Sequence, residues 1–413
     1  MVYANEYRRQ DPLGAGGARN RQPAGPLSFV APEPMSRVFV TIVSPAENFG
    51  PHWDALIPRA RVNVFLSPAA LNAVHAMDFA KVHVLLAWER HAQPERLVGV
   101  WALWERKILN NGPAYLSTPA YDYSFLSNPV IDPEFMDETM AAFLDAVERH
   151  PSLPNSLRLF YLDGECASYR ALERALTVRR SPMHLVSERL RPAVSRSFGQ
   201  KRQSSTTIKK LRQQYNRLSK IGPIEIVNAR EHDAAMAAFD DFVALEAASW
   251  KGERGTALAN RKKDLAFTRA LLSNLAKAGN ASVALMKVGD RSVASQVMLY
   301  CENIAYTWKV AFDAEFSSYS PGVQLMHRLT EQLLSTTEID EIESCAHEGS
   351  FLSKLWDGER RSVNLLVRVG KKRSLTFAVL VAMTRVRAKL KEWRNTLQEG
   401  RRSVRPLKPR ATA

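Results

Sequence analysis

Three apolar segments joined by tight turns constrain the fold of this chain most strongly. Valine, leucine, alanine and aromatic side chains dominate residues Ala281–Val288, Val293–Tyr300 and Ile304–Phe312. Short polar turns, Gly289-Asp290-Arg291-Ser292 and Glu302-Asn303, separate them. Connections this short, containing Gly, Asp or Asn, are typical of β-hairpins. The pattern therefore predicts an antiparallel meander of three strands in the second half of the chain.

The last of these strands runs into a polar loop that ends in Ser320, Pro321 and Gly322, where a helix over Pro321–Ser335 is predicted to begin. Serine can cap a helix, and proline at the first helical position loses no needed N–H. Gly322 lacks the Cβ that would keep a bulky anion from the exposed amides. Those amides and the helix dipole favour a phosphate or carboxylate. Two interpretations stay open, an anion site or simply a well-capped helix.

The order of predicted elements repeats between the two halves, although residue identities do not. Each half is expected to contain helices, an antiparallel arrangement of strands, and then alternating helices and strands. In the first half the predicted elements are strands Val82–Glu89 and Leu97–Leu109, a helix from Asp132 to about Glu148, strand Leu157–Leu162, helix Glu165–Leu176 and strand Met183–Ser187. In the second half, helices Asp233–Lys251 and Asn260–Ala278 precede the meander, and strands Ile339–Ser344 and Val363–Val369 follow it. The predicted fold class is α/β with mixed sheets in two lobes.

The charge of the chain is concentrated in two segments. The 413 residues carry a formal net charge of +15. Residues 189–220 contain ten Lys/Arg and no acidic residue, and residues 371–413 contain thirteen Lys/Arg and two acidic residues. The two blocks that look globular are mildly acidic, which argues against a surface that reads nucleic acid. A basic connector and a basic tail are expected, with attraction to anionic lipid or polysaccharide as an alternative.

These features divide the chain into five predicted parts. They are a disordered leader (1–36), a first lobe (37–196), a basic linker helix (197–222), a second lobe (223–370) and a basic helical tail (371–413). The three cysteines lie far apart, and neither a membrane-length apolar run nor a signal peptide is visible, so a cytoplasmic protein is expected. No metal site is expected, because no metal-binding spacing is present. Cys301 and Cys345 are expected to be inert buried thiols.

Several motifs of the second half resemble a known family. They are Leu245-Glu246-Ala247-Ala248-Ser249-Trp250-Lys251-Gly252, Gly255-Thr256-Ala257, Lys309, Phe312-Asp313 and Tyr319-Ser320-Pro321-Gly322. Together they resemble GNAT acyltransferases of the bacterial type associated with cellulose biosynthesis (CelD/BcsL), which are related to Fem-type transferases with two GNAT-like halves. The resemblance covers roughly Ser197–Val369 well and residues 38–188 in outline. It departs from the family at the lysine expected just before Trp356, which is displaced, and at Pro119–Ser124 of the first half, which lacks a helix-start glycine. That stretch is therefore expected to form a wall of an acceptor cleft and to bind no cofactor.

The resemblance implies an acyl-CoA as the donor, and acetyl-CoA is the acyl-CoA that it favours. Its predicted site is the helix start formed by Tyr319, Ser320, Pro321, Gly322, Val323, Gln324 and Leu325. The predicted catalytic residues are Glu246, Lys309 and Asp313, and the predicted acceptor-binding residues are Trp250, Lys251, Gly255 and Thr256.

Each predicted role has an alternative. Glu246 is a general base or a carboxylate paired with Lys251 or Arg254. Asp313 positions the acceptor or caps the loop. Lys309, in an apolar strand, needs a carboxylate partner, either Asp313 or Glu246. Trp250 lines the acceptor site or belongs to the core.

The resulting hypothesis is a two-lobed acyltransferase that transfers directly to an amine or hydroxyl of a cell-envelope sugar or polysaccharide precursor. Two alternatives remain. One is a Fem-like transferase that uses aminoacyl-tRNA, motivated by the basic segment at 189–220. The other is an inactive, GNAT-shaped assembly factor of a polysaccharide synthase, associated with an anionic membrane surface through its basic tail.

Overall fold

A computed structural model describes residues 36–109, 111–196, 205–336, 338–346, 349–370 and 373–403. The predicted leader lies outside the described residues except for Ser36. Within the described ranges, no helix is both long and apolar enough to cross a membrane.

The first half begins with an edge strand and ends with an unusually long one. Its elements are β1 (Val38–Val43), α1 (Gly50–Leu56), α2 (Pro68–Ala76), β2 (Val82–Glu89), β3 (Leu97–Lys107), β4 (Ala114–Thr118), β5 (Val130–Ile131), α3 (Met136–Arg149), β6 (Ser156–Asp163), α4 (Ala167–Val178) and β7 (Met183–Ser195). The predicted antiparallel pair is β2 and β3. Strands β1 and β4 were not predicted from the sequence.

The second half repeats this order after a connecting helix. Its elements are α5 (Ser205–Leu218), β8 (Ile224–Ala229), α6 (His232–Ala247), α7 (Trp250–Glu253), α8 (Lys262–Lys277), β9 (Ala281–Val288), β10 (Arg291–Cys301), β11 (Ile304–Phe312), α9 (Pro321–Ser335), β12 (Glu341–Glu343), β13 (Gly358–Arg368) and α10 (Leu375–Ser403). The predicted meander is confirmed, since β10 pairs antiparallel with both β9 and β11. The single helix predicted over Asp233–Lys251 is wrong, because Ser249 is extended and its hydroxyl accepts from Lys251 N to start α7.

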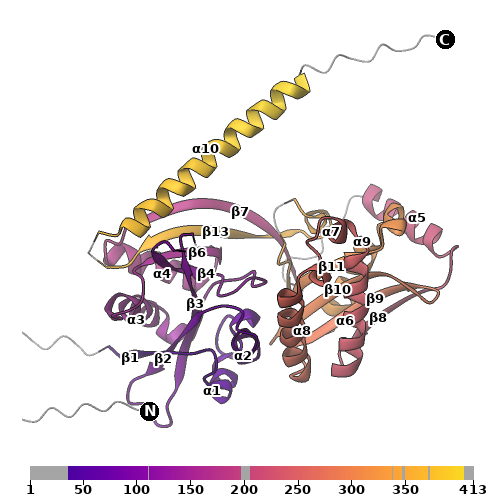
Figure 1. The fold of residues 1–413 in the computed structure, drawn as a ribbon. Helices are drawn as coiled ribbons and strands as arrows, with labels where there is room; N and C mark the ends of the chain where they lie inside the picture. Colours follow the sequence, from indigo (N-terminus) through magenta and orange to yellow (C-terminus); the bar gives the residue numbers. More distant parts are fainter. Residues whose placement is uncertain are drawn as a thin grey trace, which may run out of the picture. The chain divides into compact units, whose positions relative to one another are not determined.

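All of these strands belong to one sheet, in the order β1-β2-β3-β4-β6-β13-β7-β12-β11-β10-β9-β8, with β5 attached to β3 (Figure 1). Each half contains one parallel step, β4 beside β6 and β11 beside β12. The predicted fold class, α/β with a mixed sheet, is confirmed.

The two halves exchange their last strands. Strand β13, from the end of the second half, lies between β6 and β7 of the first half, and β7 in turn pairs with β12 of the second half. The sequence predicts β7 only as far as Ser187, because arginines interrupt its apolar pattern. It continues to Ser195, and Arg191 is buried there because Glu343 of β12 lies 3.2 Å away.

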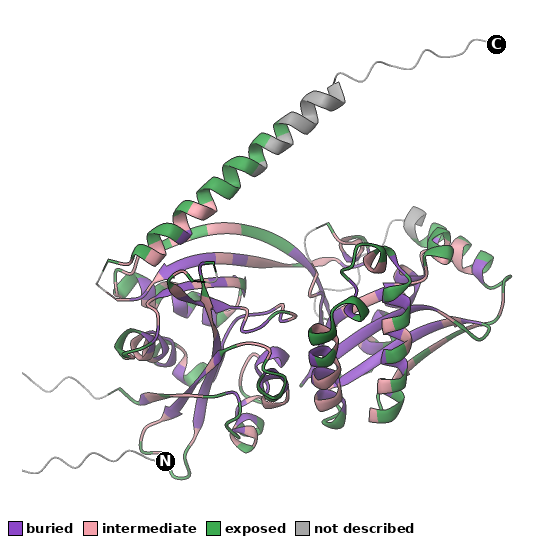
Figure 2. Cartoon of the chain, in the orientation of Figure 1, coloured by how far each residue is buried: buried purple, intermediate pink, exposed green. Residues whose placement is uncertain are grey.

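Helices cover both faces of this sheet (Figure 2). One buried cluster combines α1 and α2 with α6 and α8, and so contains side chains of both halves. Helices α3 and α4 cover the opposite face of the first half, and α5 and α9 pack on the second half. Near the start of α10, Leu380 is buried and packs with Leu366 of β13. Most later described positions of this helix are exposed.

Candidate active site

A β-bulge in β11 sets the position of Lys309. Val297 of β10 pairs with Lys309, but the next residue, Met298, pairs with Thr307, so Trp308 is the extra residue. A bulge of this kind redirects the side chains beside it. The Lys309 side chain is 13% exposed, and its Nζ lies 4.6 Å from the centre of the Tyr123 ring. The indole of Trp308 donates to the carbonyl of Tyr123 at 2.8 Å.

Glu246 is the carboxylate beside Lys309. Its side chain is buried at the end of α6, with Oε1 2.9 Å from Lys251 Nζ and 3.9 Å from Lys309 Nζ. Its Oε2 accepts from the backbone N–H of Leu258 at 2.9 Å. Because both oxygens have protein donors, these contacts favour a role in positioning the two lysines over a role as general base.

The pKa of Lys309 is lowered to about 8. Burial is the largest cause; the charge of Lys251 lowers the pKa further, while the charge of Glu246 opposes the shift. Burial disfavours the charged form of an amine. A lysine with a pKa near 8 is neutral in a large fraction of molecules at mildly alkaline pH and can then accept a proton.

Asp313 lies beyond the end of β11 and turns toward Arg291, with 2.5 Å between its Oδ2 and Nη2 of the arginine. Its Oδ1 accepts from the N–H of Glu315 at 3.0 Å and so caps the following turn. Of the two partners left open for Lys309, the structure brings Glu246 close. The contacts of Asp313 support the loop-capping interpretation.

The start of α9 differs from the predicted cap. Ser320 has left-handed backbone angles, φ 53° and ψ 50°, and its side chain makes no capping bond. The prediction that this hydroxyl caps the helix is therefore wrong, since capping requires an extended residue at that position. The Ser320 carbonyl instead accepts from the N–H groups of Val323 and Gln324. The N–H of Gly322 has no acceptor among the described residues.

Helix α5 packs against this turn. The side-chain amide of Gln214 donates to the Ser318 carbonyl at 3.0 Å and to Ser320 Oγ at 3.1 Å. The guanidinium of Arg217 lies 5.4 Å from the centre of the Tyr319 ring, which places a cation beside the helix start. The basic helix therefore has a specific packing partner at the start of α9.

The predicted cofactor residues separate into two groups. Gln324 and Leu325 are buried, and Gln324 Nε2 donates to the Leu211 carbonyl at 2.7 Å, so they fix α9 to its neighbours. Pro321 and Gly322 are also buried, whereas Tyr319, Ser320 and Val323 are half-buried. The backbone turn from Tyr319 to Val323 is thus the part that remains for a ligand.

The predicted reason for a glycine at 322 is not supported. A Cβ at this position would lie 3.7 Å from side-chain atoms of Phe312 and Val310. Both belong to β11, so the added atom would face the sheet at an ordinary contact distance.

We expect Gly322→Ala to fold normally and to be up to about 1 kcal/mol more stable, because alanine is the better helix former. Urea unfolding measures this change in the free energy of unfolding. A clear loss of stability would contradict the placement of this Cβ.

The predicted acceptor-binding residues surround the short helix α7. Trp250 is 50% exposed, so the alternative that placed it in the core is wrong. Lys251 is held by Glu246 and by the Val310 carbonyl, at 3.3 Å. Gly255 has φ 66°, and Thr256 N–H donates back to the Lys251 carbonyl at 2.8 Å, which closes the turn.

The loop of the first half that contains Pro119–Ser124 reaches Lys309 through Tyr123. Tyr123 donates through its hydroxyl to Asp264 of α8 at 2.6 Å, and its ring faces Lys309. Burial and the carboxylate of Asp264 raise the pKa of Tyr123. The sequence analysis did not single out Tyr123 or Asp264, because only the fold brings them to β11.

The cysteines and Trp356 make structural contacts. Burial raises the pKa of Cys301 to about 12 and also raises that of Cys345, which makes both poor nucleophiles. Trp356 is buried and donates to Thr330 at 3.1 Å. In the described part of the chain, no three His, Cys, Asp or Glu side chains gather in a way that could hold a metal ion.

Comparisons with known proteins give one family match and several similar folds. Residues 205–346 match the sequence family described as an acetyltransferase (GNAT) domain. No curated protein sequence matches the chain significantly. The crystal structure of FemX has a TM-score of 0.54 and 9% identity, over 80% of this chain and 97% of that one, which shows a shared fold.

Two further solved structures are similar at lower scores. A C-terminal domain (DUF2156) of a putative lysylphosphatidylglycerol synthetase from Agrobacterium fabrum has a TM-score of 0.48 and 12% identity, covering 83% of this chain and 96% of that chain. A tandem GNAT protein from the clavulanic acid biosynthesis pathway has a TM-score of 0.43 and 10% identity, covering 81% of this chain and all of that chain.

Proposed function

We propose that this protein transfers an acyl group, most simply acetyl, from acyl-CoA to an amine or hydroxyl of a cell-envelope sugar or polysaccharide precursor. The match of residues 205–346 to the GNAT acetyltransferase domain supports an acyltransferase. The finer assignment to the cellulose-associated type is part of this proposal. It rests on the motifs from Leu245 to Gly322 described above.

The observation that carries the proposal is the geometry of β11 and α9. The ladder between β11 and β12 covers only Ile304–Tyr306, so the rest of β11 has no ladder partner on that side among the described residues. An extended chain with amides, such as the pantetheine arm of CoA, can pair with such an edge. The unpaired N–H of Gly322 at the start of α9, with Arg217 nearby, suits the diphosphate of the same molecule.

The proposed chemistry is direct transfer. The lone pair of the acceptor nitrogen or oxygen attacks the thioester carbonyl, the carbon–sulfur bond breaks, and CoA leaves as the thiolate. Neutral Lys309 takes the proton that the acceptor loses, and a proton from solvent restores the CoA thiol. The high thiol pKa values of Cys301 and Cys345 support transfer without a covalent enzyme intermediate.

The remaining residues have supporting roles in this proposal. Glu246 holds Lys309 and Lys251 in place, and Asp313 shapes the loop before α9. The acceptor lies against Trp250 and the turn at Gly255 and Thr256, with Tyr123 opposite.

Calorimetric titration of the full chain with acetyl-CoA, desulfo-CoA and adenosine diphosphate tests the proposal. All three are expected to bind, because all carry the diphosphate, and acetyl-CoA at a hundredfold its Kd adds about 2.7 kcal/mol to the free energy of unfolding. Arg217→Ala is expected to weaken all three, whereas Lys277→Ala on α8 serves as a matched loss of one exposed cation. Absence of binding at millimolar acetyl-CoA would remove the basis of the proposal and leave the aminoacyl-tRNA alternative to be tested.

A further inference from the structure

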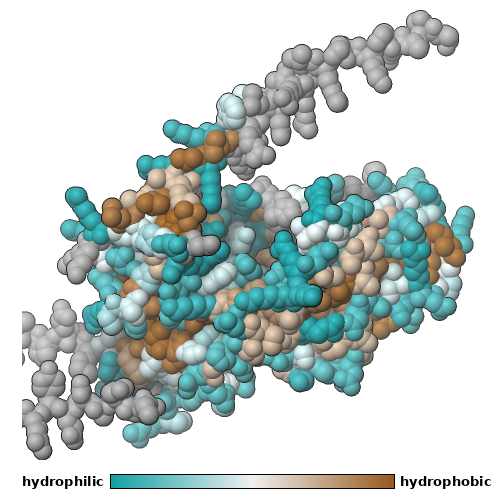
Figure 3. Space-filling view, viewed as in Figure 1, coloured by the Kyte–Doolittle hydropathy of each residue, from teal (hydrophilic) through white to brown (hydrophobic). Residues whose placement is uncertain are grey.

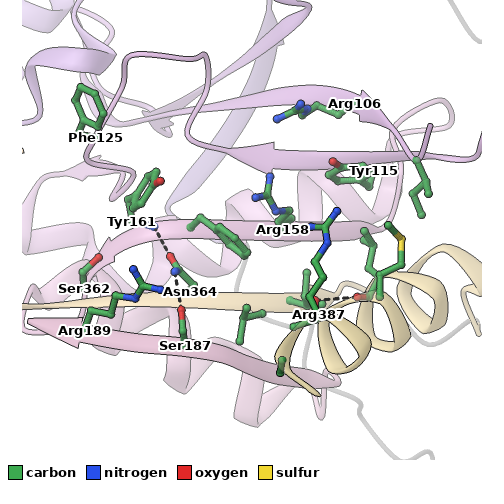
Figure 4. Close-up of a pocket in the computed structure, with 18 of the residues that line it drawn as sticks. Arg106, Tyr115, Phe125, Arg158, Tyr161, Ser187, Arg189, Ser362, Asn364 and Arg387 are labelled. Atoms are coloured by element: carbon green, nitrogen blue, oxygen red, sulfur yellow. Dashed lines mark hydrogen bonds between the residues drawn. The ribbon is translucent and has the colours of Figure 1, made fainter. Parts of the chain in front are cut away.

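A second site lies on the first half, away from α9. A cavity of about 1060 Å³ is bounded by β3, β4, β6, β7 and β13 on one side and by α10 on the other (Figure 4). The cavity lies on one face of the sheet, and α3 and α4 cover the other face. The side chains of β6 and β13 alternate between the two faces, so those that contact α3 and α4 do not line the cavity. None of the predicted site residues lines the cavity.

Three arginines from three different elements meet in this cavity. Arg106 comes from β3, Arg158 from β6 and Arg387 from α10, and Figure 4 shows Arg158 and Arg387 extending toward the side of the cavity on which Arg106 lies. Burial lowers the pKa of Arg158, and the charges of Arg106 and Arg387 lower it further. Arg158 is therefore close enough to each of the other two arginines to be repelled by their charges.

Aromatic rings hold two of these guanidinium groups. Arg158 lies 3.9 Å from the centre of the Phe160 ring, and Arg106 lies 4.2 Å from that of Trp104. Among the described residues, no carboxylate lies within ion-pair distance of any of the three arginines. The one carboxylate that lines the cavity, Glu392, is exposed on α10.

Two other arginines that are partly or fully buried have carboxylate partners. Arg191 has Glu343, and Arg61 has Glu341 at 2.7 Å. Burying a cation without such a partner is unfavourable, and like charges nearby add to the penalty. Arg106 and Arg158 are partly buried without such a partner, and Arg387 adds an exposed cation beside them. The cavity therefore presents several guanidinium groups, whose forked N–H groups bind phosphate oxygens in pairs.

The wall beside the arginines is apolar. It includes Ile108, Leu366, Leu380 and Met383, and also Leu109, whose side chain is 82% exposed. Figure 3 shows apolar side chains gathered at the start of α10, where this wall lies. The cavity therefore offers an anion site directly next to a surface suited to an uncharged group.

We propose that this cavity binds a phosphorylated ligand, with the phosphate held by Arg106, Arg158 and Arg387 and the neighbouring uncharged part on the apolar wall. The phosphate belongs either to a soluble phosphate ester or to a phospholipid headgroup. This inference does not depend on acyl transfer at Lys309, because the two sites share no residue that either argument uses.

The test uses the full chain with two probes. Binding of inorganic pyrophosphate is measured by calorimetry, and binding to phosphatidylglycerol vesicles is measured by sedimentation against phosphatidylcholine vesicles. Arg158→Gln and Arg387→Gln are expected to weaken binding of at least one probe about tenfold or more, as for loss of a charge-assisted hydrogen bond. Arg385→Gln, on the same helix but outside the cavity lining, is expected to change it by less than about twofold.

The outcomes distinguish the two possible sources of the phosphate and show whether the site exists. Arginine-dependent pyrophosphate binding indicates a soluble ester, and arginine-dependent binding of vesicles alone indicates a lipid headgroup. If neither probe depends on Arg158 and Arg387, or if Arg385→Gln has the same effect, the site does not exist. Without probe, Arg387→Gln should not lower the unfolding temperature, because it removes a repulsion; a lowered temperature would instead assign these arginines a structural role.

Discussion

Replacing Arg191 by methionine is expected to lower the free energy of unfolding by up to about 3–5 kcal/mol at pH 7, because the buried carboxylate of Glu343 loses its buried cation and keeps only the more distant Arg61, at 3.5 Å. Arg191 is 5% exposed on β7 and pairs with Glu343, which is 2% exposed on β12. This pair joins the exchanged strand of the first half to the second half. Urea unfolding followed by circular dichroism measures the loss.

The loss should depend on pH in a defined direction. Burial raises the pKa of Glu343, and the nearby carboxylate of Glu341 raises it further, whereas Arg191 opposes the shift. A carboxyl group with a raised pKa in the folded state favours folding below its unfolded pKa, and this contribution is lost as the pH rises through the folded pKa. Removing Arg191 raises the pKa of Glu343 further, so the variant should lose more of its free energy of unfolding at pH 8 than at pH 5.

A double variant provides the control. Arg191→Met combined with Glu343→Met should recover most of the lost stability, because an apolar pair replaces a buried ion pair. A deficit that is equal at both pH values, or that the second substitution does not reduce, would contradict the role assigned to this pair.

Replacing Lys309 by methionine is expected to reduce acyl transfer by about 10²–10⁴-fold, the usual contribution of a general base. Release of the CoA thiol from acetyl-CoA with glucosamine as a model acceptor measures the rate. In the unmodified protein the rate should rise with pH through an apparent pKa of about 8, as the amine of Lys309 loses its proton. Lys277→Met on α8 should leave the rate unchanged.

Chemical labelling tests the same lysine without an acceptor. The reactivity of Lys309 toward a small acylating reagent, followed by mass spectrometry, should increase with pH around 8, well below the range of exposed lysines. Glu246→Gln should lower this midpoint further, because the opposing carboxylate charge is lost. A midpoint near 10.4 would contradict the proposed role of Lys309.

Elements with local patterns could be predicted from the sequence. The meander β9–β10–β11 and helix α9 follow from apolar runs, tight turns and a proline at the helix start. Strand β7 could be predicted only in part, because Arg191 is buried by a partner that lies 152 residues away in the chain. The exchange of β7 and β13 has no local signal, since it depends on pairings between the halves.

The site could be predicted to a similar extent. An ammonium in an apolar strand requires a partner, which left Asp313 and Glu246 as the candidates for Lys309, and only the structure shows that Glu246 is the nearer one. The conformation of Ser320 could not be predicted, because Ser-Pro-Gly fits both an extended cap and the left-handed turn that the structure has. Tyr123 and Asp264 come from segments without a motif, and the arginine cavity is assembled from three elements distant in sequence.

Hydrogen–deuterium exchange of the full chain, with and without CoA, tests most directly whether the first turn of α9 receives the diphosphate. Bound CoA should slow exchange at the amides of Gly322–Leu325 and along Lys309–Phe312, with little change at the start of α3. Unchanged exchange at Gly322–Leu325 in the presence of saturating CoA would contradict the proposed donor site.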